Sequence, residues 1–218
     1  MGDAMKKALA LVSSVVATCI LAVSLVGCSS ASPQDVTTAT LDEIKALDFE
    51  GNMAELKTSI EQGVKEAAGT DVELTDDEQA VVNKLLNKMC DFDYMLGDAT
   101  VDGDHASVPV TFTTYDIKGT FTSSMRSYLQ NLYASALSTG TVPSQQEIVA
   151  QYFSELSTAI DALEEKSVTA QGTITLTKTD GAWTVDQLDN TTINAMFGGI
   201  ADVPTEMSSI GNEFISAN

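Results

Sequence analysis

The feature that most constrains the fold of this chain is a repeated change in the spacing of its apolar residues. In residues 41–90 and again in 123–166 they recur every three to four positions, which is typical of helices. In residues 92–112 and 168–185 they alternate with polar side chains, which is typical of strands with one solvated face. Helices and strands that occur in separate groups predict an α+β fold with an antiparallel sheet packed on helices.

Local signals mark where the predicted helices begin. The chain contains three capping boxes, formed by Thr40 with Glu43, Thr75 with Glu78, and Ser144 with Glu147. Ser123 or Ser124 is the predicted cap of a further helix that Gly140 ends. We therefore expect a helical hairpin inserted between the two groups of strands.

Turn residues divide the strands. Asp102-Gly103-Asp104 and Asp180-Gly181 are typical of tight hairpin turns. Pro109 cannot donate to a strand ladder, so it predicts an edge or a bulge at its position. A short helix is expected over 190–197, and the weakly apolar tail that follows either docks on the domain or stays free.

The N-terminus has the pattern of an export signal. Lys6 and Lys7 precede an apolar run over residues 8–26, as in secretory signal peptides. The run approaches the roughly 20 residues that cross a bilayer, so an uncleaved membrane anchor is the alternative.

The end of this run resembles the lipobox of bacterial lipoproteins. Its residues are Leu25, Val26, Gly27 and Cys28. The resemblance implies that Leu25, Val26 and Gly27 are recognised by signal peptidase II, and that a diacylglycerol is attached to Cys28. The mature protein is then held on the extracytoplasmic face of a bacterial membrane by two or three acyl chains, which suffice for stable anchoring.

The sequence thus divides into four parts. Residues 1–27 are the predicted lipoprotein signal peptide, and 28–40, rich in Ser, Ala and Thr, are predicted to be a flexible tether. Residues 41–197 are the predicted α+β domain, and 198–218 form a C-terminal tail.

Charge and cysteine content narrow the classes of partner. With 31 acidic and 11 basic residues the formal charge is −20, and no basic run is present, so nucleic acid is excluded as a partner.

Removing the signal peptide leaves two cysteines, Cys28 and Cys90. Because Cys28 carries the lipid, no internal disulfide can form, and Cys90 is expected to be a small buried hydrophobe.

Two segments resemble a known superfamily. The stretches 92–116 and 168–188, with "DATVDGDHASV" and "DGAWTVDQL" inside them, are similar to the sheet segments of small bacterial lipoproteins with a nuclear-transport-factor-like, or cystatin-like, domain of unknown function. This resemblance over residues 41–197 implies a curved sheet wrapped around helices to form a cone whose mouth holds a ligand. The helix pair over 122–166 departs from the usual plan of that superfamily.

Most catalytic and metal-binding signatures are missing from the sequence. His105 is the only histidine and is expected to be an exposed turn residue, which excludes zinc sites on ligand count. No Gly-x-Ser-x-Gly motif, phosphate-binding glycine loop or complete EF-hand loop is present, although Asp91 and Asp98 begin acidic stretches. No cofactor is expected.

If a cone forms, five residues are candidates for its pocket: Tyr115, Asp116, Arg126, Tyr133 and Trp183. Surface exposure of Arg126 and core positions for Tyr133 and Trp183 are the simpler interpretations. Three functions stay open: a non-enzymatic ligand-binding or adapter module, an enzyme-like pocket using Asp116 or Tyr115 as acid or base, and a calcium-responsive acidic envelope protein. The partners expected are the membrane, a small ligand or envelope protein, and a second copy.

Overall fold

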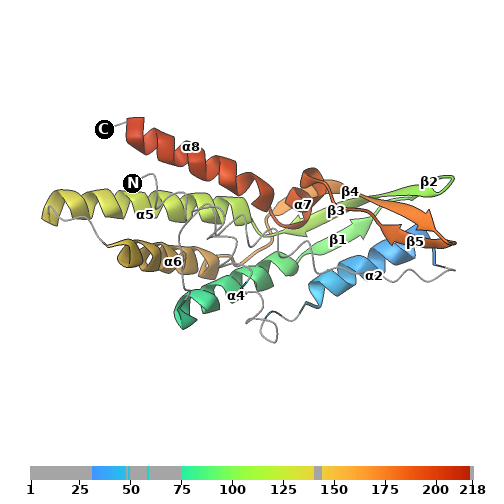
Figure 1. Ribbon diagram of the computed structural model, residues 1–218, viewed down its shortest axis with the longest axis horizontal. Coiled ribbons are helices and arrows are strands. Elements are labelled where there is room, and N and C mark those ends of the chain that lie inside the picture. The colour runs from blue at the N-terminus through green and yellow to red at the C-terminus, as the bar shows by residue number, and fades with distance from the viewer. Residues whose placement is uncertain (1–30, 48, 50–57, 59–74, 140–143, 217–218) are drawn as a thin grey trace.

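The computed structural model describes residues 31–47, 49, 58, 75–139 and 144–216, and shows an elongated molecule (Figure 1). A curved antiparallel sheet occupies one end and a group of helices the other, which confirms the predicted α+β class. The elements are α2 (Pro33–Lys45), α4 (Asp76–Cys90), β1 (Asp93–Leu96), β2 (Thr100–Asp102), β3 (His105–Thr114), α5 (Ile117–Thr139), α6 (Gln145–Asp161), β4 (Val168–Thr179), β5 (Ala182–Val185), α7 (Asn190–Met196), the 3-10 helix η1 (Ile200–Asp202) and α8 (Val203–Ser216).

The sheet is built on the long β3–β4 pair. Its order is β1-β3-β4-β5, with β2 pairing beside β1 on the same side of β3. Residues 97–99 separate β1 from β2 along β3, and the Gly97 N–H donates to the Pro109 carbonyl at 2.7 Å. Pro109 therefore lies in a central strand, so the edge alternative is wrong, and it is tolerated because the neighbouring stretch 97–99 is irregular.

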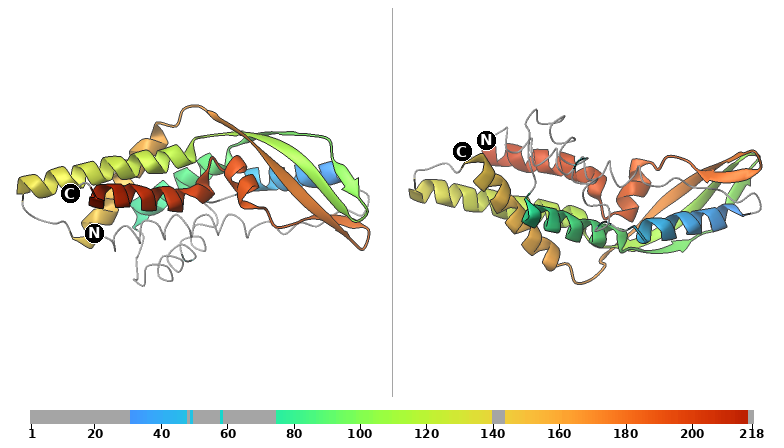
Figure 2. Two further views of the ribbon diagram at one scale, coloured as in Figure 1. Left: turned by 90° about the horizontal axis from the view of Figure 1, so that it is seen from above. Right: turned by 60° about the horizontal axis from the view of Figure 1, so that its bottom comes forward.

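The two faces of the sheet differ in chemistry. On one face of β3 the side chains of Ala106, Val108, Val110, Phe112 and Thr114 are buried. The other face of β3 and β4 is exposed or half-buried and mostly hydroxylic, with Ser107, Pro109, Thr111, Thr113, Thr169, Gln171, Thr173 and Thr175. Helices α2 and α7 contact the strands (Figure 2). The hydroxylic face is therefore the solvated face that the alternating sequence predicts.

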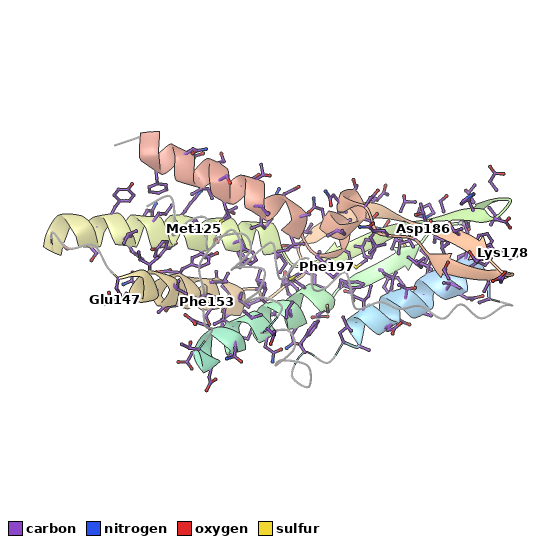
Figure 3. All side chains as sticks on the ribbon, in the orientation of Figure 1. Met125, Glu147, Phe153, Lys178, Asp186 and Phe197 are labelled. Atoms are coloured by element: carbon purple, nitrogen blue, oxygen red, sulfur yellow. The ribbon has the colours of Figure 1, made fainter. Side chains whose placement is uncertain are left out.

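The core continues from the sheet into the helices through Phe92. Its ring is fully buried and meets the rings of Phe112 in β3 at 5.7 Å and Phe197 after α7 at 6.2 Å. Figure 3 shows Phe197 where the sheet and the helices meet. Gly198 follows with a positive φ of 61° and lies against the Tyr115 carbonyl, so a side chain there would collide with the backbone.

Helix α7 covers part of the β4 edge. Strand β5 pairs only with Leu176–Thr179, which leaves the earlier part of that edge open. There the Thr192 hydroxyl accepts from the Thr173 N–H at 3.1 Å and donates to the Thr173 carbonyl at 3.0 Å, as a neighbouring strand would. Gly172 permits this approach, since a Cβ on it would lie 3.0 Å from the Thr192 Cα.

The second half of the molecule is formed by the inserted helices α5 and α6 together with α4 and α8. Helix α5 packs along α6 and α8, and α4 packs on α6. The Tyr128 and Tyr152 rings meet edge to face at 5.9 Å between α5 and α6. This arrangement confirms the predicted helical hairpin.

The first helix begins earlier in the structure than the sequence predicts. Helix α2 begins at Pro33, because Ser32 caps it in a capping box with Asp35. Val36, Thr37 and Thr40 are buried. Residues 33–40 are therefore a packed helix and not part of a flexible tether. The prediction failed because threonines occupy buried positions, which weakens the apolar pattern.

The structure also corrects the start of α5 and shows where the C-terminal tail lies. Helix α5 begins at Ile117, well before Ser123, because the Asp116 Oδ1 accepts from the Gly119 N–H at 2.8 Å and caps the helix. The C-terminal tail docks, since α8 packs on α5 with Met207 and Ile210 buried. The lipobox and most of the helix expected after residue 47 lie outside the described residues.

Candidate functional site

The five residues predicted for a cone pocket do not come together. Tyr133 in α5 stacks on Phe214 of α8 with ring centroids 5.7 Å apart, and Arg126 pairs with Glu213 at 3.0 Å. Trp183 is buried in β5, with the Lys178 ammonium 5.3 Å from its ring centre. These side chains contribute to packing and surface ion pairs in separate parts of the fold.

Asp116 and Tyr115 have structural contacts in place of an acid–base site. Asp116 is exposed and its carboxylate caps α5. The buried Tyr115 donates its hydroxyl hydrogen to the Asp91 Oδ2 at 3.0 Å. The alternative of an acid–base pocket at Asp116 therefore has no support here, because its carboxylate is exposed and caps a helix.

The exposed face of the sheet carries a cleft of about 370 Å³, which we call the sheet-face cleft. It extends from β1 across β3 and β4 to the start of α7. Its lining comprises Met95, Leu96, Gly97, Pro109, Val110, Thr111, Gln171, Gly172, Thr173, Asp189, Thr191 and Thr192. A volume of this size is within the range of small-ligand sites.

The strand register places the residues that form the floor of the sheet-face cleft side by side. Met95 pairs with Thr111, and Thr111 pairs with Gln171 on the next strand. Pro109 pairs with Thr173 in the same way. Because alternate residues of a strand share a face, these five side chains form one continuous surface. The alternation predicted a wet face, but it did not predict which strands are neighbours or that α7 would wall one end.

The sheet-face cleft is rich in hydrogen-bonding groups and has a single charge. Hydroxyl and amide groups of Thr111, Gln171, Thr173 and Thr191 can donate and accept. Asp189 is the one charged lining residue, and its Oδ1 accepts from the Thr192 N–H at 2.7 Å. Hydrogen bonds from the backbone and side chain of Thr192 lower the pKa of Asp189 below its usual value, so the carboxylate is ionised at neutral pH.

Further carboxylates around the strands form no ion pair among the described residues. Asp98, Asp102 and Asp104 lie in or beside the loops next to β2 and are exposed, and Asp186 directly follows β5 (Figure 3). Within the described ranges none of these four takes part in an ion pair. The sheet end of the molecule therefore carries a negative field that its own side chains do not neutralise.

A polar cluster ties the sheet to the helices. The Lys166 Nζ lies 2.8 Å from Asp91 and 3.1 Å from Asp93. Partial burial raises the pKa of Asp91, but hydrogen bonds from Lys166 and Tyr115 and the charges of Lys166 and Lys88 outweigh it, so the net pKa is lowered. Burial lowers the pKa of Lys166, but hydrogen bonds to Asp91 and Asp93 and their negative charges outweigh it. The net pKa of Lys166 is therefore raised. We interpret this cluster as structural.

Two other predicted residues have the exposure that the sequence predicted. Cys90 is buried, and burial raises the pKa of its thiol to about 12, so it is a thiol and not a thiolate at neutral pH. His105 is exposed at the start of β3, with its Nδ1 3.4 Å from the Thr177 Oγ1. The burial of Cys90 and the exposure of His105 are confirmed, but His105 belongs to β3 and not to the turn, because it pairs with Asp102 and Thr177.

In the described part of the chain, no set of three His, Cys, Asp or Glu residues is placed to hold a metal ion. None of the described helices is both long and apolar enough to cross a bilayer.

Comparison with known proteins yields one distant structural neighbour. No protein-family model matches the sequence, and no curated protein matches it. A solved structure of a candidate lipoprotein (ycdA) from Bacillus subtilis aligns over 70% of this chain, with 14% identity and a TM-score of 0.41. The chain spans about half of that protein's length, 47%.

Proposed function

We propose that this chain is an exported bacterial lipoprotein, anchored through Cys28, whose folded part binds a ligand or partner on the exposed face of the sheet. The proposal for the anchor rests on the lipobox residues Leu25 to Cys28. The proposal for binding rests on one observation, the sheet-face cleft: a hollowed, continuous polar surface across three strands.

The groups in the sheet-face cleft favour binding over catalysis. Its floor offers hydroxyls, one amide and a thioether, which form hydrogen bonds and dispersion contacts without accepting or releasing protons near pH 7. The one ionised lining group, Asp189, holds the start of α7. We therefore propose a non-enzymatic ligand-binding or adapter module.

The anchor is tested by replacing the lipidated cysteine. In the proposed scheme Cys28→Ala blocks lipid attachment, so the protein no longer incorporates labelled palmitate and leaves the membrane fraction. Cys19→Ala is the control, because Cys19 lies inside the predicted signal peptide. Palmitate label that persists in Cys28→Ala would contradict lipid attachment at Cys28, and membrane attachment without the label would indicate the uncleaved membrane anchor.

The binding face is tested by native mass spectrometry of the full lipidated chain, purified in non-ionic detergent from its own host. We expect an added mass that disappears on denaturation and is absent from Thr173→Lys, which places a bulky charge in the sheet-face cleft. Ser209→Lys is the control, since Ser209 is exposed on α8. The same added mass in both variants, or none in the wild type, counts against this face.

A further inference from the structure

The sheet-face cleft lies in a part of the surface that lacks positive charge. None of its lining residues is Lys, Arg or His, and Asp189 supplies a fixed carboxylate at one end. Asp98 and Asp186, each beside a strand of the sheet, have no ion-pair partner in the part of the chain that the structure describes. A ligand that enters here meets negative potential and no cation among the lining residues.

The cations of the described residues are engaged elsewhere. Lys45, Lys88 and Lys178 lie over aromatic rings. The others form ion pairs, Lys84 with Asp161, Lys118 with Asp202, Arg126 with Glu213, and Lys166 with Asp91 and Asp93. Recruiting any of them to the sheet-face cleft would break an existing contact, so no cation of the described residues is free to balance its charge.

The shape of the sheet-face cleft suits a short extended chain. It crosses β1, β3 and β4, and strands about 4.8 Å apart give a span of roughly 10 Å, or about three extended residues. Threonine hydroxyls and the Gln171 amide can both donate to and accept from peptide groups. Met95, 69% exposed, offers an adaptable apolar contact at one end.

Charge also argues against two other occupants. A second copy of this chain carries the same formal charge of −20, so pairing two such faces would bring like charges together. Anionic polymers face the same repulsion from Asp189 and its acidic neighbours. A cationic segment is the complement of this surface.

From these observations, and resting on the proposed function of the face, we infer that the sheet-face cleft binds an extended, lysine- or arginine-rich peptide segment of a partner protein. The basic side chains pair with Asp189 and the surrounding aspartates, and the backbone of the segment bonds to the threonine floor.

The test uses fluorescence anisotropy with the full lipidated chain in non-ionic detergent. The probe is a labelled octapeptide of alternating lysine and threonine, and the controls replace lysine with glutamate or glutamine. We expect saturable binding of the lysine peptide alone, weakening as NaCl rises from about 0.05 to 0.5 M.

Two variants locate the binding site. Thr173→Lys is expected to weaken binding at least about tenfold, because it places a like charge on the floor of the cleft. Asp189→Asn keeps a good helix cap and removes one charge, so a loss of about threefold to fivefold is expected. Glu206→Gln and Ser209→Lys change the charge by the same amounts on exposed positions of α8 and are expected to leave the affinity unchanged.

Equal weakening by the α8 variants would show attraction by net charge alone and overturn the inference. Failure of the lysine peptide to bind, alongside binding of chitotetraose that Thr173→Lys abolishes, would replace the peptide with a glycan while keeping the face as the binding site. If Thr173→Lys also leaves unchanged the added mass seen by native mass spectrometry, the proposed function itself fails.

Discussion

The helical half and the sheet half of this molecule differ in how many of their charged side chains form ion pairs. In the helical half, formed by α4, α5, α6 and α8, surface charges pair between helices, as Lys84 does with Asp161 at 2.9 Å and Arg126 with Glu213 at 3.0 Å. In the sheet half, formed by the strands with α2 and α7, Asp102 and Asp104 have no such partner among the described residues. Ion pairs therefore join neighbouring helices in the helical half, whereas the carboxylates around β2 form none among the described residues.

The two halves also bury their side chains differently. Helices α5 and α6 press apolar stripes together, with Met125 and Phe153 among the buried residues. The sheet buries one face and leaves the other hydroxylic and hollowed. Stability is therefore concentrated in the helices and in the inner face of the sheet, and the outer face is available for recognition.

The largest expected effect tests the boundary between the halves. Phe92→Ala removes a fully buried ring that contacts Phe112 and Phe197, so we expect a loss of about 3–5 kcal/mol in the free energy of unfolding. Urea denaturation measures it. Met95→Ala, on the open face, is the control and should change stability by no more than about 0.5 kcal/mol. Similar losses in both variants would mean that the two sheet faces do not differ as described.

The second prediction compares the loss of stability when a helix cap is changed in each half. The Thr75 Oγ1 accepts from the Glu78 N–H at 3.3 Å, and the Glu78 Oε2 accepts from the Thr75 N–H at 2.8 Å. Thr75→Ala breaks this capping box and should cost about 1 kcal/mol. Asp189→Asn, at the start of α7, should cost only a few tenths of a kcal/mol because asparagine caps as well as aspartate. A larger loss from Asp189→Asn than from Thr75→Ala, measured by thermal denaturation, would reverse the comparison.

A third prediction concerns the cluster that joins the halves. Because the folded-state pKa of Asp91 is lowered, its contribution is present above the unfolded value near 4 and is lost as the pH falls through the folded value. The Asp91 side chain is 54% exposed, so solvent screening limits the expected loss in Asp91→Asn to about 1 kcal/mol or less at pH 7.

The pH dependence checks the sign of this contribution. The difference between wild type and Asp91→Asn should shrink when urea midpoints are compared at pH 5 and then at pH 2. The raised pKa of Lys166 adds stability below its ordinary value of 10.5 that is lost as the pH rises through the folded value. A gap that widens on acidification would show that Asp91 does not stabilise the junction as a carboxylate.

The smallest expected effect lies within the helical interface. The buried Tyr128 hydroxyl has no hydrogen-bond partner among the described residues, and burial raises the pKa of this tyrosine to about 12. Tyr128→Phe removes an unsatisfied polar group while keeping the ring, so we expect stability to stay the same or rise by up to about 1 kcal/mol. A clear loss of stability in Tyr128→Phe would indicate a hidden partner for the hydroxyl.

The elements that depend on local chemistry could be predicted from the sequence. Capping boxes at Thr75 and Ser144 begin α4 and α6 as predicted, and the Asp180-Gly181 turn closes the β4–β5 hairpin. Apolar spacing distinguished helix from strand because the two periods differ over short windows. Cysteine count and apolar neighbours predicted a buried Cys90 in the same way.

The position of the sheet-face cleft, the surface proposed for binding, depends on tertiary contacts. The sheet-face cleft needs β3 beside β4 over ten residue pairs and α7 against the edge of β4, contacts between segments far apart in the chain. The sequence likewise missed the packing of 33–40 and the capping role of Asp116, because burial of threonines and the end of a helix depend on neighbouring elements. Local periodicity specifies which residues share a face, but strand order and packing are collective properties of the whole core.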